Sequence, residues 1–173
     1  MALKVAVVGM GGIGMTHARC YKENPLAELV AVCDLVKEKA DKAAEEFGCR
    51  AFYDEEEMLK CMPEIDVVSV TTSGYENGSM HYEPAMIALE YKKAVLVEKP
   101  ICADVRDARE LHDRTHRAAG LDAGTTDSRA NEDATCAVLA DDLVRDGALG
   151  GEGHVEHVLL SILDALGNGG RAF

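Results

Sequence analysis

Short apolar runs alternate with segments of helical spacing along the first 120 residues of the chain. Apolar, β-branched runs predict strands at 3–8, 29–33, 51–53, 66–71 and 94–97. The segments between and after them predict helices at 13–21, 37–47, 54–60 and 82–91, and a long helix that ends at 119 with Asp104 as its N-cap. Strands that are apolar throughout are typical of a sheet covered on both faces. The pattern therefore predicts a doubly wound α/β fold around a parallel sheet.

The pattern is weaker after Gly120. Segment 121–127 stands where a sixth strand is expected, but it has few apolar β-branched residues. Segment 131–146 fits a helix and 154–162 fits a strand. A strand at 154–162 without a sheet of its own has an unpaired edge, which a second copy of the chain can cover. We therefore expect a homo-oligomer.

Composition and charge narrow the function classes. A hydrophobic share of 47% without an apolar run of membrane-spanning length predicts a soluble protein and no membrane partner. The net charge of −13 repels nucleic-acid phosphates, so we expect no nucleic-acid partner. The six cysteines form no C-x-x-C pair, which indicates reduced thiols, a cytoplasmic location and no zinc site. His112 and His116 have metal-ligand spacing on a helix, but a solvated helix surface is the favoured interpretation.

A glycine-rich segment lies directly between the first predicted strand and helix. Its sequence, Gly9-Met10-Gly11-Gly12-Ile13-Gly14, has the form G-x-G-x-x-G. The first glycine permits a tight turn, the second lets a pyrophosphate approach the backbone, and the third allows close helix packing. Free N–H groups at the helix N-terminus attract the anion. The alternative is a turn without a ligand.

An acidic residue follows the second strand at the distance that dinucleotide binding needs. Asp34 comes 20 residues after Gly14, where a carboxylate hydrogen-bonds the adenosine ribose. A carboxylate repels a 2′-phosphate, so NAD is favoured over NADP, although the nearby Lys37 leaves NADP open. The alternative is that Asp34 is a solvated helix cap.

Glu98-Lys99-Pro100 follows the fifth strand, where the carboxyl end of a parallel sheet faces the ligand crevice. A lysine beside a nicotinamide can hydrogen-bond a substrate hydroxyl or carbonyl and assist proton movement. Lys99 is therefore the candidate catalytic residue. The alternative is a strand end that leaves the sheet through a turn.

Together these segments resemble the Gfo/Idh/MocA family of sugar and inositol oxidoreductases. The resemblance rests on GMGGIG, AVCD, VTTS with the following His81, and AVLVEKPI, and covers about 120 residues. It implies a Rossmann domain that binds a nicotinamide dinucleotide. The implied cofactor-binding residues are Gly9, Gly11, Gly12, Ile13 and Gly14 at the pyrophosphate, Asp34 at the ribose, Thr71, Thr72 and Ser73 along the cofactor, His81, and Glu98, Lys99 and Pro100 at the nicotinamide end. Lys99 would be the family's active-site lysine.

The resemblance also implies a second, substrate-binding domain, of which this chain has little. We predict a dinucleotide-binding domain at 1–127 and a short helix-strand remnant of the second domain at 128–173. The D-x-x-x-H pattern that the family often carries there does not occur. The resemblance implies an NAD(P)-dependent oxidoreductase acting on a polyol, sugar or cyclitol. The alternative is a catalytically incomplete NAD(P)-binding module.

Overall fold

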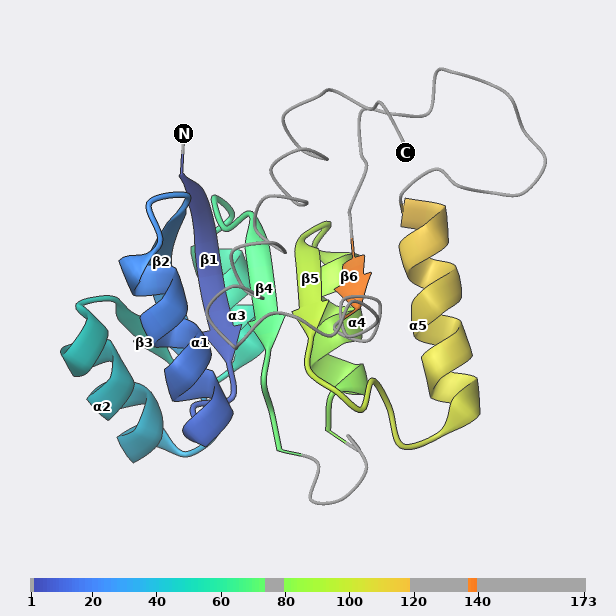
Figure 1. Cartoon of the computed structure of the whole chain (residues 1–173), viewed down its shortest axis with the longest axis horizontal. Coiled ribbons are helices and arrows are strands. Elements are labelled where there is room, and N and C mark those ends of the chain that lie inside the picture. The colour runs from blue at the N-terminus through green and yellow to red at the C-terminus, as the bar shows by residue number, and fades with distance from the viewer. Residues whose placement is uncertain (1, 74–79, 119–136, 140–173) are drawn as a thin grey trace, which may run out of the picture.

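A parallel sheet with helices on both faces forms the centre of the computed structural model, which describes residues 2–73, 80–118 and 137–139 (Figure 1). The strands are β1 (Leu3–Val8), β2 (Ala27–Cys33), β3 (Arg50–Phe52), β4 (Val67–Val70), β5 (Ala94–Val97) and β6 (Ala137–Leu139). The helices are α1 (Gly12–Glu23), α2 (Lys37–Phe47), α3 (Glu55–Cys61), α4 (Tyr82–Glu90) and α5 (Val105–Ala118). The predicted doubly wound α/β class is confirmed.

The strand order is β3-β2-β1-β4-β5-β6, and every neighbouring pair is parallel. The chain begins in the middle of the sheet with β1 and builds outward through β2 to β3. It then returns to the other side of β1 with β4 and builds outward again. The order therefore reverses between β1 and β4, and the carboxyl ends of these two strands border the crevice in which doubly wound folds bind ligands.

Two hydrophobic layers hold the helices against the sheet. On one face, Val5 and Val7 of β1 belong to a buried cluster with Ala18 of α1 and Phe47 of α2. On the other face, strand residues such as Val68 pack with α3, α4 and Leu111 of α5. Figure 1 shows α1 and α2 in front of the sheet and α3 and α4 behind it. Alternate residues of each strand thus point to opposite layers, which explains why the strands are apolar throughout.

The helix ends follow the local signals in the sequence. Asp54 caps α3, because its Oδ1 accepts a hydrogen bond from the Glu57 N–H at 2.8 Å. Asp104 Oδ1 accepts from the Arg106 N–H at 2.7 Å at the start of α5, as predicted. Gly48 ends α2 with a φ of +67°, a left-handed conformation that glycine adopts without strain.

The prediction of a helix over 131–146 was wrong at residues 137–139. These residues form β6, in which Ala137 to Leu139 pair in parallel with Val95 to Val97 of β5. Without this pairing the outer edge of β5 would leave its backbone N–H and C=O groups unpaired, and a short apolar run can cover such an edge. The predicted strands at 121–127 and 154–162, and the rest of 131–146, lie outside the described residues.

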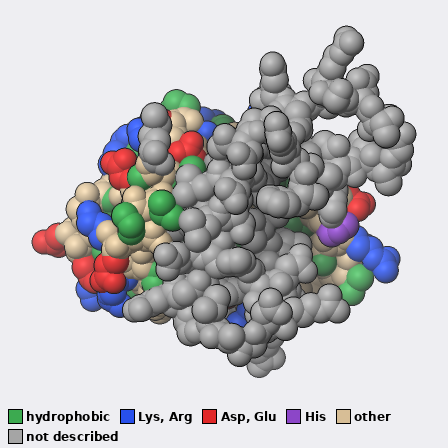
Figure 2. Space-filling view, turned by 45° about the horizontal axis from the view of Figure 1, so that its top comes forward, with side chains coloured by type: hydrophobic (Ala, Val, Ile, Leu, Met, Phe, Trp, Pro, Cys, Tyr) green, Lys and Arg blue, Asp and Glu red, His purple; other side chains and the backbone are tan. Residues whose placement is uncertain are grey.

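Acidic and basic side chains are interspersed over the described surface in Figure 2, despite the net charge of −13. None of the helices within residues 2–73 and 80–118 is long and apolar enough to cross a membrane.

Candidate functional site

Four strands end side by side at the carboxyl edge of the sheet. The β-ladder continues for one residue past each strand, because the Gly9 N–H donates to Cys33 O at 2.8 Å and the Thr71 N–H donates to Val8 O at 2.8 Å. The Glu98 N–H donates to Val70 O at 3.1 Å. The segments after β1, β2, β4 and β5, which carry the predicted site residues, are therefore neighbours in space.

The first and last glycines of the loop are required by the protein's own packing. Gly9 has a φ of +97°, and a Cβ there would lie 2.6 Å from the Thr72 backbone nitrogen. A Cβ on Gly14 would collide with the Gly9 carbonyl oxygen and lie 2.9 Å from Thr71 Oγ1. These two glycines let α1 start directly against the ends of β1 and β4.

The two middle glycines have no such packing reason. A Cβ on Gly11 or on Gly12 would meet no atom of the described residues within 4 Å. Both residues are exposed and stand at the start of α1, where no side chain caps the helix and no acidic residue occupies the first turn. Beside them, the unpaired N–H groups of the helix N-terminus are open to an anion. Ile13 is exposed on the same turn.

Asp34 contacts both the glycine loop and the segment that leads into α2. Its Oδ2 accepts a hydrogen bond from the Met10 N–H at 2.7 Å, and its Oδ1 accepts from the Val36 N–H at 2.8 Å. A carboxylate has about four lone-pair positions, so each oxygen can accept one further hydrogen bond. Asp34 lies two residues before Val36, the N-cap of α2, and α2 has no side-chain capping hydrogen bond, so the helix-cap alternative is wrong.

The three residues after β4 differ in what they contact. Thr71 is buried, and its Oγ1 lies 3.1 Å from Val8 O and 2.8 Å from Gly9 O, so the hydroxyl fixes the glycine loop from within. The Thr72 hydroxyl donates to Met80 O at 2.7 Å. Ser73 is exposed at the carboxyl edge. Thr71 thus stabilises the conformation of the glycine loop by hydrogen-bonding to its backbone.

His81 joins the segments that follow β4 and β5. Its Nε2 lies 2.6 Å from Thr72 O and its Nδ1 lies 2.7 Å from Pro100 O, and the residue is only 3% exposed. Because carbonyl oxygens only accept, both contacts are hydrogen bonds at once only when both ring nitrogens carry a proton. Although His81 is the N-cap of α4, its side chain makes no capping hydrogen bond. The His81 side chain thus connects the segment after β4 to the segment after β5.

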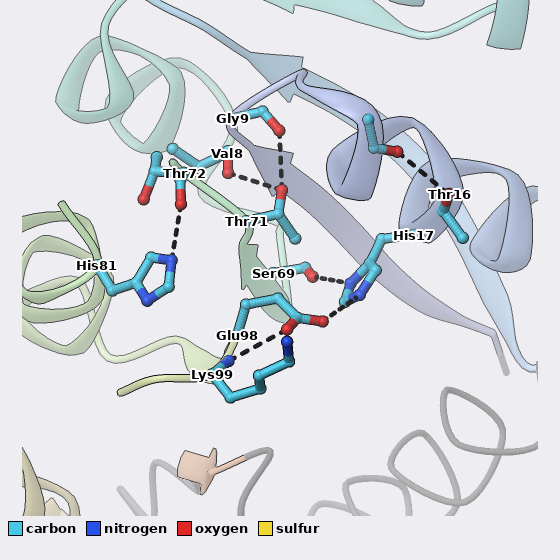
Figure 3. Close-up of polar contacts among 11 residues, drawn as sticks. Val8, Gly9, Thr16, His17, Ser69, Thr71, Thr72, His81, Glu98 and Lys99 are labelled. Atoms are coloured by element: carbon cyan, nitrogen blue, oxygen red, sulfur yellow. Dashed lines mark hydrogen bonds and ion pairs between the residues drawn. The ribbon is translucent and has the colours of Figure 1, made fainter. Parts of the chain in front are cut away.

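Glu98 and Lys99 stand at the end of β5 (Figure 3). One Glu98 oxygen lies 2.9 Å from His17 Nε2, and the other accepts from the Lys99 backbone N–H at 3.1 Å. The hydrogen bond with His17 holds the pKa of the Glu98 carboxyl below its ordinary value, against the effect of burial, and Lys99 acts in the same direction. Lys99 is exposed and Pro100 follows it through a cis peptide bond.

The sequence interpretation missed His17, Ser69 and Tyr21, which lie beneath Glu98. His17 Nδ1 lies 3.0 Å from Ser69 Oγ, and Tyr21 is hydrogen-bonded to the same serine. Two signals could have identified them. His17 falls three residues after Gly14 on the inward face of the predicted helix, and Ser69 interrupts the apolar strand Val67–Val70. Polar residues at positions that a pattern predicts to be buried need a hydrogen-bond partner.

Comparison with known proteins identifies the family. Residues 3–121 match the Gfo/Idh/MocA group, described as "Oxidoreductase family, NAD-binding Rossmann fold". The chain belongs to this family. An inositol 2-dehydrogenase/D-chiro-inositol 3-dehydrogenase from Lactiplantibacillus plantarum is 36% identical over 112 residues, which are 64% of this chain and 31% of that protein. A D-glucoside 3-dehydrogenase from Escherichia coli is 34% identical over 116 residues, 66% of this chain and 32% of that protein. The match thus spans about a third of the length of these curated Gfo/Idh/MocA relatives.

Solved structures agree with the family assignment. A scyllo-inositol dehydrogenase from Lactobacillus casei, with bound NAD(H) and scyllo-inositol, has a TM-score of 0.63 and 27% identity, covering 70% of this chain and 35% of that one. A UDP-N-acetylglucosamine 3-dehydrogenase from Acidithiobacillus ferrooxidans has a TM-score of 0.60 and 30% identity, covering 68% and 36%. The predicted Gfo/Idh/MocA family membership and Rossmann fold are confirmed.

Proposed function

We propose that this chain binds NAD at the Gly9–Gly14 loop and serves hydride transfer between NAD and a polyol, sugar or cyclitol. The observation that carries the proposal is the pair Gly11 and Gly12, whose missing side chains leave open space at the uncapped N-terminus of α1. Glycine at these two positions has no packing purpose, whereas a pyrophosphate lying against the backbone needs their lack of side chains.

Asp34 supports the choice of NAD over NADP. Its carboxylate lies beside the loop, since it accepts from the Met10 N–H, and its remaining lone pairs suit the two hydroxyls of a ribose. A 2′-phosphate on that ribose would place two negative charges in contact. The scyllo-inositol dehydrogenase from Lactobacillus casei was solved with bound NAD(H), which supports the same choice.

Lys99 is the proposed acid/base on the substrate side. The nicotinamide, when bound, accepts or supplies the hydride. An ammonium at the exposed end of β5 can donate a hydrogen bond to a substrate oxygen and exchange a proton with it as the carbonyl forms or is reduced. The sugar and inositol dehydrogenases among the relatives support this class of substrate.

A titration with NADH tests the binding proposal. NADH fluorescence and calorimetry on the purified chain should show saturable binding in the millimolar range or tighter. Gly11→Val should abolish it, because a branched side chain would fill the space of the pyrophosphate, while leaving the fold intact since no atom of the described part of the chain lies within 4 Å of the new Cβ. Thr16→Val is the matched control, because it places a valine at an exposed position one turn further along α1. No binding by the unchanged chain at millimolar NADH would refute the proposal.

The cofactor preference is tested with Asp34→Ala. The variant should narrow or reverse the preference for NADH over NADPH, and also lose the two backbone hydrogen bonds of Asp34. Asp66→Ala controls for the second effect, because Asp66 Oδ2 accepts from the Lys4 N–H at 2.8 Å at the opposite edge of the sheet. That control should keep the preference. Equal affinities of the unchanged chain for both cofactors would contradict the role of Asp34.

A second candidate function is an NAD-binding module that needs another chain or further residues for turnover. The support is that the match spans about a third of the relatives' length. Hydride transfer needs a substrate held about 3 to 3.5 Å from the nicotinamide in a site closed to water. We therefore expect the isolated chain to oxidise simple polyols very slowly. Rapid NADH formation that is lost in Lys99→Ala, with NADH affinity unchanged, would favour the full enzyme.

The proposal also covers the domain organisation, cellular location and oligomeric state of the protein. We propose a domain boundary near residue 127, a cytoplasmic location and a homo-oligomer. The cytoplasmic location is supported by the absence of a disulfide among the five cysteines in the described part of the chain. Size-exclusion chromatography with light scattering tests the oligomer.

A further inference from the structure

Four polar side chains form a continuous path beneath the carboxyl end of β5. Tyr21 and His17 come from α1, Ser69 from β4 and Glu98 from the end of β5. Figure 3 shows the His17 ring between Ser69 and the Glu98 carboxylate. Ser69 lies 52 residues and Glu98 lies 81 residues after His17, so the path joins distant segments of the chain. These four side chains take no part in the proposed binding of the pyrophosphate by the glycine loop or of the ribose by Asp34.

The hydrogen bonds along this path are all satisfied by one assignment of protons. Ser69 donates to Nδ1 of His17, Nε2 of His17 donates to Glu98, and Tyr21 is hydrogen-bonded to the same Ser69. Burial raises the pKa of the Tyr21 phenol, so the phenol keeps its proton. In this assignment Ser69 fixes the tautomer of the His17 ring, which presents an N–H to the Glu98 carboxylate.

The inner end of the path is closed, which decides between orientation and proton conduction. Tyr21 is 1% exposed and belongs to the core between α1 and the sheet. Its ring also packs edge-on against the His17 ring, with centroids 6.2 Å apart. A proton that travelled inward would have no exit to solvent. The path is therefore suited to hold Glu98 in place.

The outer end of the path reaches the backbone of Lys99. Glu98, with a side chain that is 22% exposed, uses Oε1 for His17 and Oε2 for the Lys99 N–H. Among the described residues, the titratable groups that face Glu98 are His17 and Tyr21 from α1 and Lys99 on its own segment. A carboxylate fixed at one oxygen by His17 thus directs its other oxygen at the peptide that carries the lysine.

We propose that His17 is a positioning residue, which acts through Glu98 to fix the Lys99 backbone at the carboxyl end of β5. The functional consequence, presentation of the Lys99 ammonium to a substrate oxygen, rests on the proposed function. The positioning itself is a property of the chain alone and is measured without cofactor or substrate.

Nuclear magnetic resonance of the cofactor-free chain tests the proposal with three variants. His17→Phe keeps an aromatic ring at this position and removes both ring nitrogens. His17→Gln places an amide N–H near the position of Nε2, and His17→Asn reaches only as far as Nδ1. The readouts are the titration midpoint of the Glu98 carboxyl and the hydrogen exchange rate of the Lys99 amide. His112→Phe on the exposed face of α5 is the control for loss of a histidine.

In the unchanged chain, we expect Glu98 to titrate below an ordinary glutamate and the Lys99 amide shift to follow the same titration. His17→Phe and His17→Asn should raise the titration midpoint of the Glu98 carboxyl and speed Lys99 amide exchange about tenfold. His17→Gln should restore both readouts toward their original values. His112→Phe should change neither.

Unchanged readouts in folded His17→Phe would overturn the proposal. If His17→Phe does not fold, the comparison of His17→Gln with His17→Asn tests the proposal. Equal Glu98 titration midpoints and equal Lys99 amide exchange rates in these two variants would also overturn it. Failure of NADH binding, by contrast, would refute the proposed function and leave these apo measurements standing.

Discussion

Replacing Glu55 by glutamine should make the protein more stable at alkaline pH. Glu55 is the first residue of α3, is 8% exposed, and its Oε1 has no hydrogen-bond partner among the described residues. Burial raises the pKa of this carboxyl to about 8, and the charges of Asp54 and Glu83 add to the effect. Glutamine has nearly the same shape and removes the charge that is costly to bury.

The size and pH range of the effect follow from the raised pKa. The folded chain holds the Glu55 proton more tightly than the unfolded chain, whose ordinary pKa is 4.5. Its contribution to stability is therefore fully present below pH 4.5 and is lost as the pH rises through 8. Since a tenfold change in proton affinity corresponds to about 1.4 kcal/mol, the full loss is at most about 5 kcal/mol. A domain of this size has a free energy of unfolding of about 5 to 15 kcal/mol, so the loss is large.

Urea denaturation followed by circular dichroism at pH 5, 7 and 9 measures the effect. The stability gap between Glu55→Gln and the unchanged chain should be small at pH 5 and should grow to several kcal/mol at pH 9, up to the limit of about 5 kcal/mol. Glu57→Gln is the matched control, because Glu57 lies in the same first turn of α3 but is exposed. Glu57→Gln loses the favourable contact of a carboxylate with the helix N-terminus, which is worth about 0.3 to 1 kcal/mol, whereas Glu55→Gln loses it only at a pH above about 8, where Glu55 is ionised.

Parallel stability curves of Glu55→Gln and Glu57→Gln between pH 5 and pH 9 would refute the reasoning. They would show that the Glu55 carboxylate is solvated in the folded chain, with an ordinary pKa. A gap that grows toward low pH would contradict the sign of the linkage.

Three further outcomes are expected. Gly14→Ala should cost more than about 2 kcal/mol in urea denaturation, because its Cβ collides with the Gly9 carbonyl, whereas Gly12→Ala should change stability by less than about 1 kcal/mol. Thr71→Val should cost about 1 to 3 kcal/mol, because it removes the donor to the Gly9 carbonyl. Gly12→Ala should nevertheless weaken NADH binding in a fluorescence titration, and equal affinity in Gly12→Ala and the unchanged chain would contradict the proposed pyrophosphate site.

The strands were predictable where burial on both faces makes the sequence continuously apolar. The run at 94–97 gave the bounds of β5, and the runs for β1 and β4 agree with the structure within a residue at each end. The strand β6 was not predictable, because only three residues form it and its conformation depends on the open edge of β5. Local periodicity favoured a helix there, and pairing with a distant strand decided otherwise.

The candidate site likewise has a part that could be predicted from the sequence and a part that could not. The glycine loop and Asp34 could be predicted because their chemistry depends on spacing within one βαβ unit, and the structure brings them together through the Met10 N–H. The path from Tyr21 to Glu98 could not, because Ser69 and Glu98 are distant from His17 in the sequence. A buried histidine needs partners, but sequence alone does not say which residues supply them.

The shape of the site is set before any ligand arrives, because side chains tie the strand ends to one another through backbone groups. Asp34 holds the Met10 N–H, the Thr71 hydroxyl holds the Gly9 carbonyl, and His81 bridges the segments after β4 and β5. Each such hydrogen bond contributes about 1 kcal/mol to stability, so together they can keep the loop ordered in the free chain. A loop that is already ordered loses little conformational freedom on binding, and less of the binding energy is needed to order it. Variants that remove one of these hydrogen bonds should therefore lower both stability and cofactor affinity, whereas Gly11→Val, which removes none of them, should lower cofactor affinity alone.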